Sequence, residues 1–450
     1  MQRTAWLAGI ALVVGAGETA FGQTAPYPGA GAAGSSSAEV TSGNRFNPDI
    51  SVILEGNAYW DDADGEGAGL PGLAEGINAA HGGAGHDHGH AHGGDEPGFN
   101  LKPTELLFSA SVDPYFDAFV QAVIEDSGEV GLEEAYFTTT ALPAGLRVKG
   151  GQFLSGIGYH NEKHRHQWEF IEQNLPYQHL LGPHGLMDSG VQLTWTPATP
   201  VYTHFGVEAL QGDQEVVGRF AGEEAIHGLE EEGHVTGGTL DPYRDPDEGP
   251  RLFTAFAKVA PDLGYSHELQ AGLFGVYATD HQEIHGGETL PVHVTNGQSW
   301  VVGTDWVYAY DAPDQYGKGD IKLQAEYLYA VKDLEVAYHA EDPSVEGDRR
   351  EFTEDGFYVQ GRYGFAANWR AGARYDMVGL TNKREGPGTA THWDRSERIS
   401  ANVTWSPSHF SRLQAQWSRP EIATDHGTET ANQFFLRYIL SLGQHGAHDF

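Results

Sequence analysis

The chain has 450 residues, no cysteine, 60 glycines and a formal net charge of -37. Without cysteine it can hold neither a disulfide framework nor a thiolate metal site, and its acidity disfavours binding to the phosphates of nucleic acid. Beyond the N-terminus no apolar run approaches the roughly 20 residues of a membrane-spanning helix. These features exclude a helical membrane protein but leave a large β-barrel open, because a barrel strand shows lipid only every second side chain.

The N-terminus has the pattern of a secretory signal peptide. Arg3 supplies a positive start, residues 7–14 an apolar centre, and Ala20-Phe21-Gly22 a small-x-small cleavage signal. We therefore expect residues 1–22 to be removed. The segment that follows, residues 23–45, is rich in proline, glycine, alanine and serine, which predicts a flexible periplasmic lead-in.

From residue 46 to residue 450 the dominant signal is alternation of apolar and polar side chains. About sixteen such segments occur, each near the 9–11 residues that cross a bilayer at a tilt. Long connections are predicted at residues 61–102, 160–189, 211–250, 280–299, 331–355 and 381–396. The pattern predicts an all-β fold, a single transmembrane antiparallel barrel with short periplasmic turns and long extracellular loops, surrounded by lipids and lipopolysaccharide of a bacterial outer membrane. A secreted β-sandwich also alternates, but aromatic residues near the strand ends favour the barrel.

The end of the chain supports the same interpretation. Counting back by twos from Phe450 reaches Leu442, Leu440, Tyr438 and Leu436, so the terminal aromatic is in phase with the lipid-facing set of the last strand. An aromatic closing strand that ends in phenylalanine resembles the signal read by the barrel-assembly machinery. Whether the barrel forms a homo-oligomer is left open.

The first long loop, residues 61–100, carries a histidine-rich tract. Imidazoles and carboxylates are ligands for zinc, copper or nickel, and the intervening glycines predict loose, exchangeable capture of a metal ion rather than a structural site. The alternative is a low-complexity polar loop with incidental histidines. No cofactor is expected to be required. The candidate ligands are His81, His86, Asp87, His88, His90, His92, Asp95 and Glu96.

The loop over residues 159–188 is too apolar for water. We expect it to fold into the barrel as a constriction, although a contact patch between barrels in an oligomer would explain the same composition. The candidate residues of this loop are His164, His166, Trp168, Phe170 and Tyr177.

The polar faces of the strands predict the charge of the lumen. Early strands are mainly acidic and late strands mainly basic, which would set a transverse field across a channel, unless the arginines merely pair with neighbouring carboxylates. No Gly-x-Ser-x-Gly, His-Glu-x-x-His or P-loop signature suggests an enzyme. The predicted pore-lining residues are Glu55, Glu105, Asp117, Glu125, Arg362, Arg370, Arg374, Arg398, Arg412 and Arg437.

Residues 130–161 and the closing residues 441–450 resemble plug-less proteobacterial outer-membrane proteins labelled zinc-regulated and TonB-dependent receptor-like. The first stretch is more loosely similar to phosphate-selective porins. The resemblance implies a porin-like barrel with a role in zinc passage, which the tract from His81 to His92 matches. The receptor label requires a plug domain and about 22 strands, and residues 23–46 hold no plug.

We therefore expect passive or facilitated uptake of divalent metal ions rather than energy-coupled transport. Two alternatives stay open at this point. One is an anion- or phosphate-selective porin in which the late-strand arginines dominate, and the other is a non-conducting barrel that binds metal at the cell surface.

Overall fold

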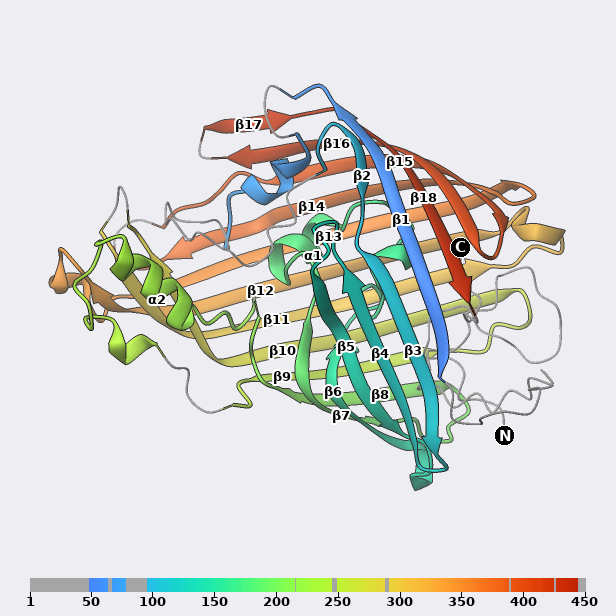
Figure 1. Ribbon diagram of the computed structural model, residues 1–450, viewed down its shortest axis with the longest axis horizontal. Coiled ribbons are helices and arrows are strands. Elements are labelled where there is room, and N and C mark those ends of the chain that lie inside the picture. The colour runs from blue at the N-terminus through green and yellow to red at the C-terminus, as the bar shows by residue number, and fades with distance from the viewer. Residues whose placement is uncertain are drawn as a thin grey trace.

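The computed structural model describes residues 48–63, 67–77, 95–214, 216–244, 249–287, 291–387, 390–424 and 426–443. In these residues eighteen strands form one antiparallel sheet, which pairing between the first and last strands closes into a barrel (Figure 1). The strands are β1 (Asp49–Asp61), β2 (Gly98–Leu101), β3 (Thr104–Asp113), β4 (Phe116–Ile124), β5 (Val130–Thr139), β6 (Leu146–Leu154), β7 (Met187–Trp195), β8 (Tyr202–Leu210), β9 (Leu252–Ala260), β10 (His267–His285), β11 (His293–Tyr310), β12 (Ile321–His339), β13 (Arg349–Ala366), β14 (Trp369–Glu385), β15 (Ser396–Ser408), β16 (Ser411–Thr424), β17 (Gly427–Thr430) and β18 (Gln433–Gly443).

Two of these strands are short continuations of a neighbour. β2 and β3 both pair with β1, and β17 and β18 both pair with β16. When the four-residue strands β2 and β17 are counted with their neighbours, the eighteen strands of the described chain form a sixteen-stranded barrel. Pro103 lies at the first interruption, where it cannot donate to the ladder. The predicted barrel of about sixteen strands is confirmed.

The alternation of side chains follows the sequence pattern. On β18, Leu436 and Leu440 are exposed on the outside, whereas Arg437 and Ile439 are completely buried inside. The apolar outer face and the closed antiparallel sheet fit the predicted location in a bacterial outer membrane, where a barrel needs no unpaired strand edge. None of the helices in the described ranges is long and apolar enough to span a membrane.

The lengths of the strands differ from the sequence prediction. β10 to β14 run for 17–19 residues instead of the predicted 9–11. The long loops predicted at residues 280–299 and 331–355 are therefore wrong, because most of their residues continue the strands, as in the pairing of His285 with His293 and of His293 with His339. The loop predicted at residues 381–396 is shortened at its start, because β14 continues to Glu385. The polar ends of these strands pair through their backbones, and their sequence has no alternation that would predict a strand.

Short helices lie in several of the connections between strands. α2 (Gly222–Glu231) packs its Ile226 and Leu229 on Val294 at the extended end of β11, at the left of Figure 1. The 3-10 turns are η2 (Gly67–Leu73), η3 (Pro143–Gly145), η4 (Arg165–Gln167), η5 (Asp241–Tyr243), η6 (Gln315–Gly317) and η7 (Pro343–Val345).

The main hydrophobic core lies inside the barrel. The connection from β6 to β7, residues 155–186, folds into the lumen with α1 (Leu175–Leu180), and its apolar side chains pack on inward residues of the wall such as Phe256 and Leu328. The start of the first long loop also turns inward, since Leu70 packs with Leu175 and Ile422. A wholly polar lumen is thus not what the chain builds.

The outward face of β18 can be tested with a charge. Leu436→Arg would place a guanidinium in the apolar belt, which we expect to lower the free energy of unfolding in lipid vesicles by about 2–4 kcal/mol. Urea titration followed by tryptophan fluorescence measures this change.

Leu73→Arg is the matched control, because Leu73 is exposed in η2 rather than on the outer wall. Equal destabilisation by the two substitutions would contradict the assignment of the belt.

Candidate functional site

The centre of the barrel is occupied by residues 155–186, which we call the constriction loop. Its predicted anchors lie buried: Trp168 donates from Nε1 to the Lys163 carbonyl at 2.9 Å, and the Phe170 ring lies 4.6 Å from the Arg374 guanidinium. Tyr177 donates from its hydroxyl to Glu326 Oε2 at 2.7 Å. The loop therefore reaches from β6 across the lumen to the opposite wall.

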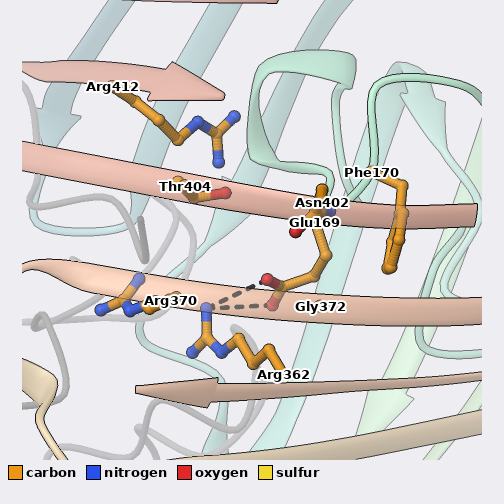
Figure 2. A pocket seen from close by; sticks show the side chains of 8 residues that line it. All are labelled: Glu169, Phe170, Arg362, Arg370, Gly372, Asn402, Thr404 and Arg412. Carbon is orange, nitrogen blue, oxygen red and sulfur yellow. Dashed lines mark hydrogen bonds and ion pairs between the residues drawn. The ribbon is translucent and has the colours of Figure 1, made fainter. Parts of the chain in front are cut away.

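Two loop carboxylates face the basic wall. Glu169 forms ion pairs with Lys322 at 2.8 Å and Arg362 at 3.1 Å. Figure 2 shows Glu169 descending between the strands toward the Arg362 guanidinium. Glu172 accepts hydrogen bonds from Ser418 Oγ at 2.5 Å and Gln416 Nε2 at 2.8 Å, and it lies 3.4 Å from Arg398 Nη1.

Backbone carbonyls of the loop complete these contacts. Arg374 donates to the carbonyl of Glu172 at 2.9 Å, Asn402 to that of Glu169 at 2.9 Å and Arg437 to that of Trp168 at 3.2 Å. Arg398 and Arg412 donate to the carbonyls of Gln173 and His166. Burying backbone requires such partners, so four of the six predicted pore-lining arginines, Arg374, Arg398, Arg412 and Arg437, bind the loop backbone.

The opposite side of the loop is basic and faces the acidic wall. Arg165 Nε lies 3.2 Å from Glu55 Oε1, and His166 Nδ1 lies 2.7 Å from Glu105 Oε2. His164 Nε2 lies 2.8 Å from Glu134 Oε2. The acidic side of the loop therefore faces the basic wall, and its basic side faces the acidic wall. We call these contacts between residues 155–186 and the two walls the clamp.

A cavity remains beside the clamp on its basic side. Arg362, Arg370 and Arg412 line it together with Glu169, and Figure 2 shows the Arg362 guanidinium directed at the Glu169 carboxylate. Its remaining lining is polar apart from one aromatic ring and consists of Phe170, Gly372, Asn402 and Thr404.

Other predicted site residues lie away from the clamp. Asp117 accepts from Ser111 Oγ at 2.7 Å near the short turn between β3 and β4, and Glu125 lies half-buried in the connection from β4 to β5. Asp95 accepts from Asn57 Nδ2 at 2.6 Å and pairs with Lys102, while Glu96 is exposed. The remaining candidate ligands, His81, His86, Asp87, His88, His90 and His92, and the terminal Phe450 lie outside the described residues.

Sequence reasoning missed Glu133, Glu134, Glu169 and Glu172. A signal existed for the first pair: two adjacent carboxylates interrupt the alternation of β5, which indicates a β-bulge. For Glu169 and Glu172 no local pattern exists, because their partners lie on strands far away in sequence.

Removing one carboxylate tests the clamp. Glu169→Gln leaves Lys322 and Arg362 without their anionic partner, and we expect the free energy of unfolding to fall by about 1.5–3 kcal/mol. Urea titration of the protein in lipid vesicles, followed by tryptophan fluorescence, measures this change.

The control is Glu335→Gln, which removes an exposed ion pair with Arg349 at 3.3 Å and should change stability by less than about 1 kcal/mol. A change of the same size in both variants would show that Glu169 does not hold the loop.

The clamp also predicts a dependence on pH. Although burial alone would raise the pKa of the Glu169 carboxyl, the charges of Arg362 and Lys322 hold this pKa well below its usual range. A depressed folded-state pKa stabilises the fold above the unfolded value of about 4.3 and loses that contribution as the pH falls below it.

We therefore expect the difference in unfolding free energy between the wild type and Glu169→Gln to be constant from pH 7 to about pH 5 and to shrink below about pH 4. Urea titrations at several pH values measure it. A difference that persists undiminished at pH 3 would refute the charge pairing.

Known proteins are similar to this chain in sequence or in fold. No known family profile matches the sequence. Over 413 residues the chain is 30% identical to an uncharacterized protein of Aquifex aeolicus (strain VF5), an alignment that covers 90% of this chain and 80% of that protein.

Two solved structures are similar in shape at low sequence identity. In-vitro folded OmpT, an outer-membrane protein of Vibrio cholerae, has a TM-score of 0.51 with 12% identity, covering 90% of this chain and all of that one (100%). The outer-membrane channel DcaP of Acinetobacter baumannii has a TM-score of 0.47 with 14% identity over 88% and 97% of the two chains. The likeness to OmpT shows the antiparallel β-barrel fold of bacterial outer-membrane proteins, and the chain belongs to the same family as the Aquifex aeolicus protein.

Proposed function

We propose that the protein is an outer-membrane channel through which divalent metal cations, zinc foremost, cross passively along the acidic side of the constriction. The main observation behind this proposal is that two histidines of the constriction loop lie against carboxylates of the wall. These residues are His164 and His166 on the loop and Glu105, Glu133 and Glu134 on the wall. Imidazole and carboxylate together are a ligand set for zinc and related ions.

The distribution of charge supports cations over anions. On the basic wall, Arg374, Arg398 and Arg437 are engaged by loop carbonyls, and Glu169 and Glu172 bring negative charge to the same side. A lining in which carboxylates outnumber exposed guanidinium groups concentrates cations. The whole chain is acidic in the same sense, with 63 aspartates and glutamates against 26 lysines and arginines.

The histidine tract from His81 to His92 belongs to the same proposal as an element that captures metal outside the channel. Its support is the sequence alone: closely spaced imidazoles among glycines bind divalent ions weakly and release them readily. Asp95, at the end of the same loop, accepts from Asn57 and pairs with Lys102.

A second candidate function is an anion-selective channel. The observation that favours it is the cavity of Figure 2, which Arg362, Arg370 and Arg412 line. Three guanidinium groups around one carboxylate are a suitable setting for a small oxyanion.

Electrophysiology and flux separate the candidates. Full-length protein in planar bilayers should conduct, and in a KCl gradient its reversal potential should have the sign of cation selectivity. Proteoliposomes with an entrapped zinc-sensitive dye should admit zinc, and a variant lacking residues 82–94 should do so more slowly only when zinc is scarce.

A reversal potential of the opposite sign would favour the anion channel and refute our proposal. A folded barrel without conductance would indicate a surface metal binder instead, which the apolar core inside the lumen would explain.

A further inference from the structure

A group of metal-ligating side chains lies between the constriction loop and strands β3 to β5. Glu105, Glu133 and His164 each offer a ligand atom, and these three atoms lie within 4.8 Å of one another. Glu105 and His164 are buried, whereas the Glu133 side chain is 28% exposed. The group is therefore largely enclosed, and Glu133 is its most solvent-accessible member.

A β-bulge places the carboxylates of this group. Gln121 pairs with Glu134 and the next residue, Ala122, pairs with Leu132, so Glu133 is the extra residue of β5. Without the bulge, neighbouring side chains would point to opposite faces of the sheet. With it, Glu133 and Glu134 both reach His164, at 3.4 Å and 2.8 Å. Bulges of this kind are typical of sites where a side chain must be redirected.

The hydrogen bonds of His164 determine which ring nitrogen has a lone pair available to bind a metal ion. Its Nδ1 lies 3.0 Å from Nε2 of Gln121 and 3.4 Å from Glu133 Oε2, on the side of the other two ligand candidates. Its Nε2 lies 2.8 Å from Glu134 Oε2, and since an ionised carboxylate only accepts, Nε2 carries a proton. In the neutral ring the lone pair of Nδ1 then faces Glu133 and Gln121. A carboxylate that binds one imidazole nitrogen and turns the other toward a common centre is the usual outer-shell arrangement of a metal-binding histidine.

Gln121 shows that the centre has too many acceptors. Its Nε2 lies 2.9 Å from Glu105 Oε2, 2.6 Å from Glu133 Oε2 and 3.0 Å from His164 Nδ1. An amide group has two hydrogens and cannot serve three acceptors. Its own Oε1 is buried without a hydrogen-bond partner in the described part of the chain. A cation at this centre would satisfy the excess lone pairs, and rotation of the amide would add Oε1 to them.

We propose that Glu105, Glu133 and His164 bind one divalent transition-metal ion of the zinc class, and that Gln121 completes its coordination. The imidazole favours such an ion over magnesium or calcium, which prefer oxygen ligands alone. Zinc holds nitrogen and oxygen ligands at about 2.0–2.2 Å, and rotation of the two glutamate side chains closes the remaining distance. The placement of this site on the cation path rests on the proposed function, but its occupancy does not.

Anomalous diffraction tests the site directly. Crystals of the full chain grown over a series of zinc concentrations are measured on either side of the zinc absorption edge. We expect a peak between Glu105, Glu133 and His164, whose occupancy shifts to at least tenfold higher zinc in Glu133→Gln. Glu134→Gln, which removes a positioning residue, should shift it by about 10–100-fold.

Asp117→Asn is the matched control, because it neutralises a carboxylate of the same wall next to Ser111 and outside the group. It should leave the occupancy unchanged. The same crystals show whether the constriction loop keeps its place in each variant, which separates loss of a ligand from loss of the fold.

The outcomes distinguish this site from the channel. No peak at the centre, or equal occupancy in the wild type and Glu133→Gln with the loop in place, would overturn the site even if zinc crosses proteoliposomes. A peak that Glu133→Gln abolishes, in a protein through which zinc does not pass, would support the site and overturn the proposed function instead.

Discussion

The pairing of the constriction loop with two oppositely charged walls determines the interior of this barrel. A loop that enters a lumen loses water from its carbonyls and side chains, and each lost hydrogen bond must be replaced. Here guanidinium groups of β14, β15, β16 and β18 supply donors, while Glu55 and Glu105 receive the basic side of the loop. Because the two faces of the loop differ in charge, only one orientation satisfies both walls.

The apolar part of the interior depends on the same loop. Tyr177 packs among the core side chains and donates to Glu326, which also accepts from the backbone of His160 at 2.9 Å. Gly158 allows this approach: it has a φ of +59°, and a Cβ at this position would lie 2.3 Å from the Tyr177 hydroxyl. Polar and apolar contacts therefore cooperate, since the glycine turn that seats Tyr177 also directs two backbone N–H groups, those of Tyr159 and His160, at the wall carboxylate.

The sequence predicts those features that repeat locally. Alternation identifies which face of β18 meets lipid, and the apolar composition around Trp168 and Phe170 indicates a loop that cannot remain in water. It does not predict that β10 to β14 extend beyond the bilayer-crossing length, because polar strands pair through their backbones and leave no periodic signal. It also does not predict which arginine meets which carbonyl, since this depends on register between segments more than two hundred residues apart.

The metal-ligating group also depends on contacts between segments that are distant in sequence. Glu105, Glu133 and His164 come from two strands and the constriction loop, and each has an ordinary structural interpretation when read alone. The bulge in β5 and the clamp are what bring them together, the first by turning Glu133 inward and the second by fixing the loop that carries His164. A site built in this way is sensitive to the position of the loop. Any ion bound there would in turn stabilise the loop, since binding to the folded arrangement alone shifts the equilibrium toward it.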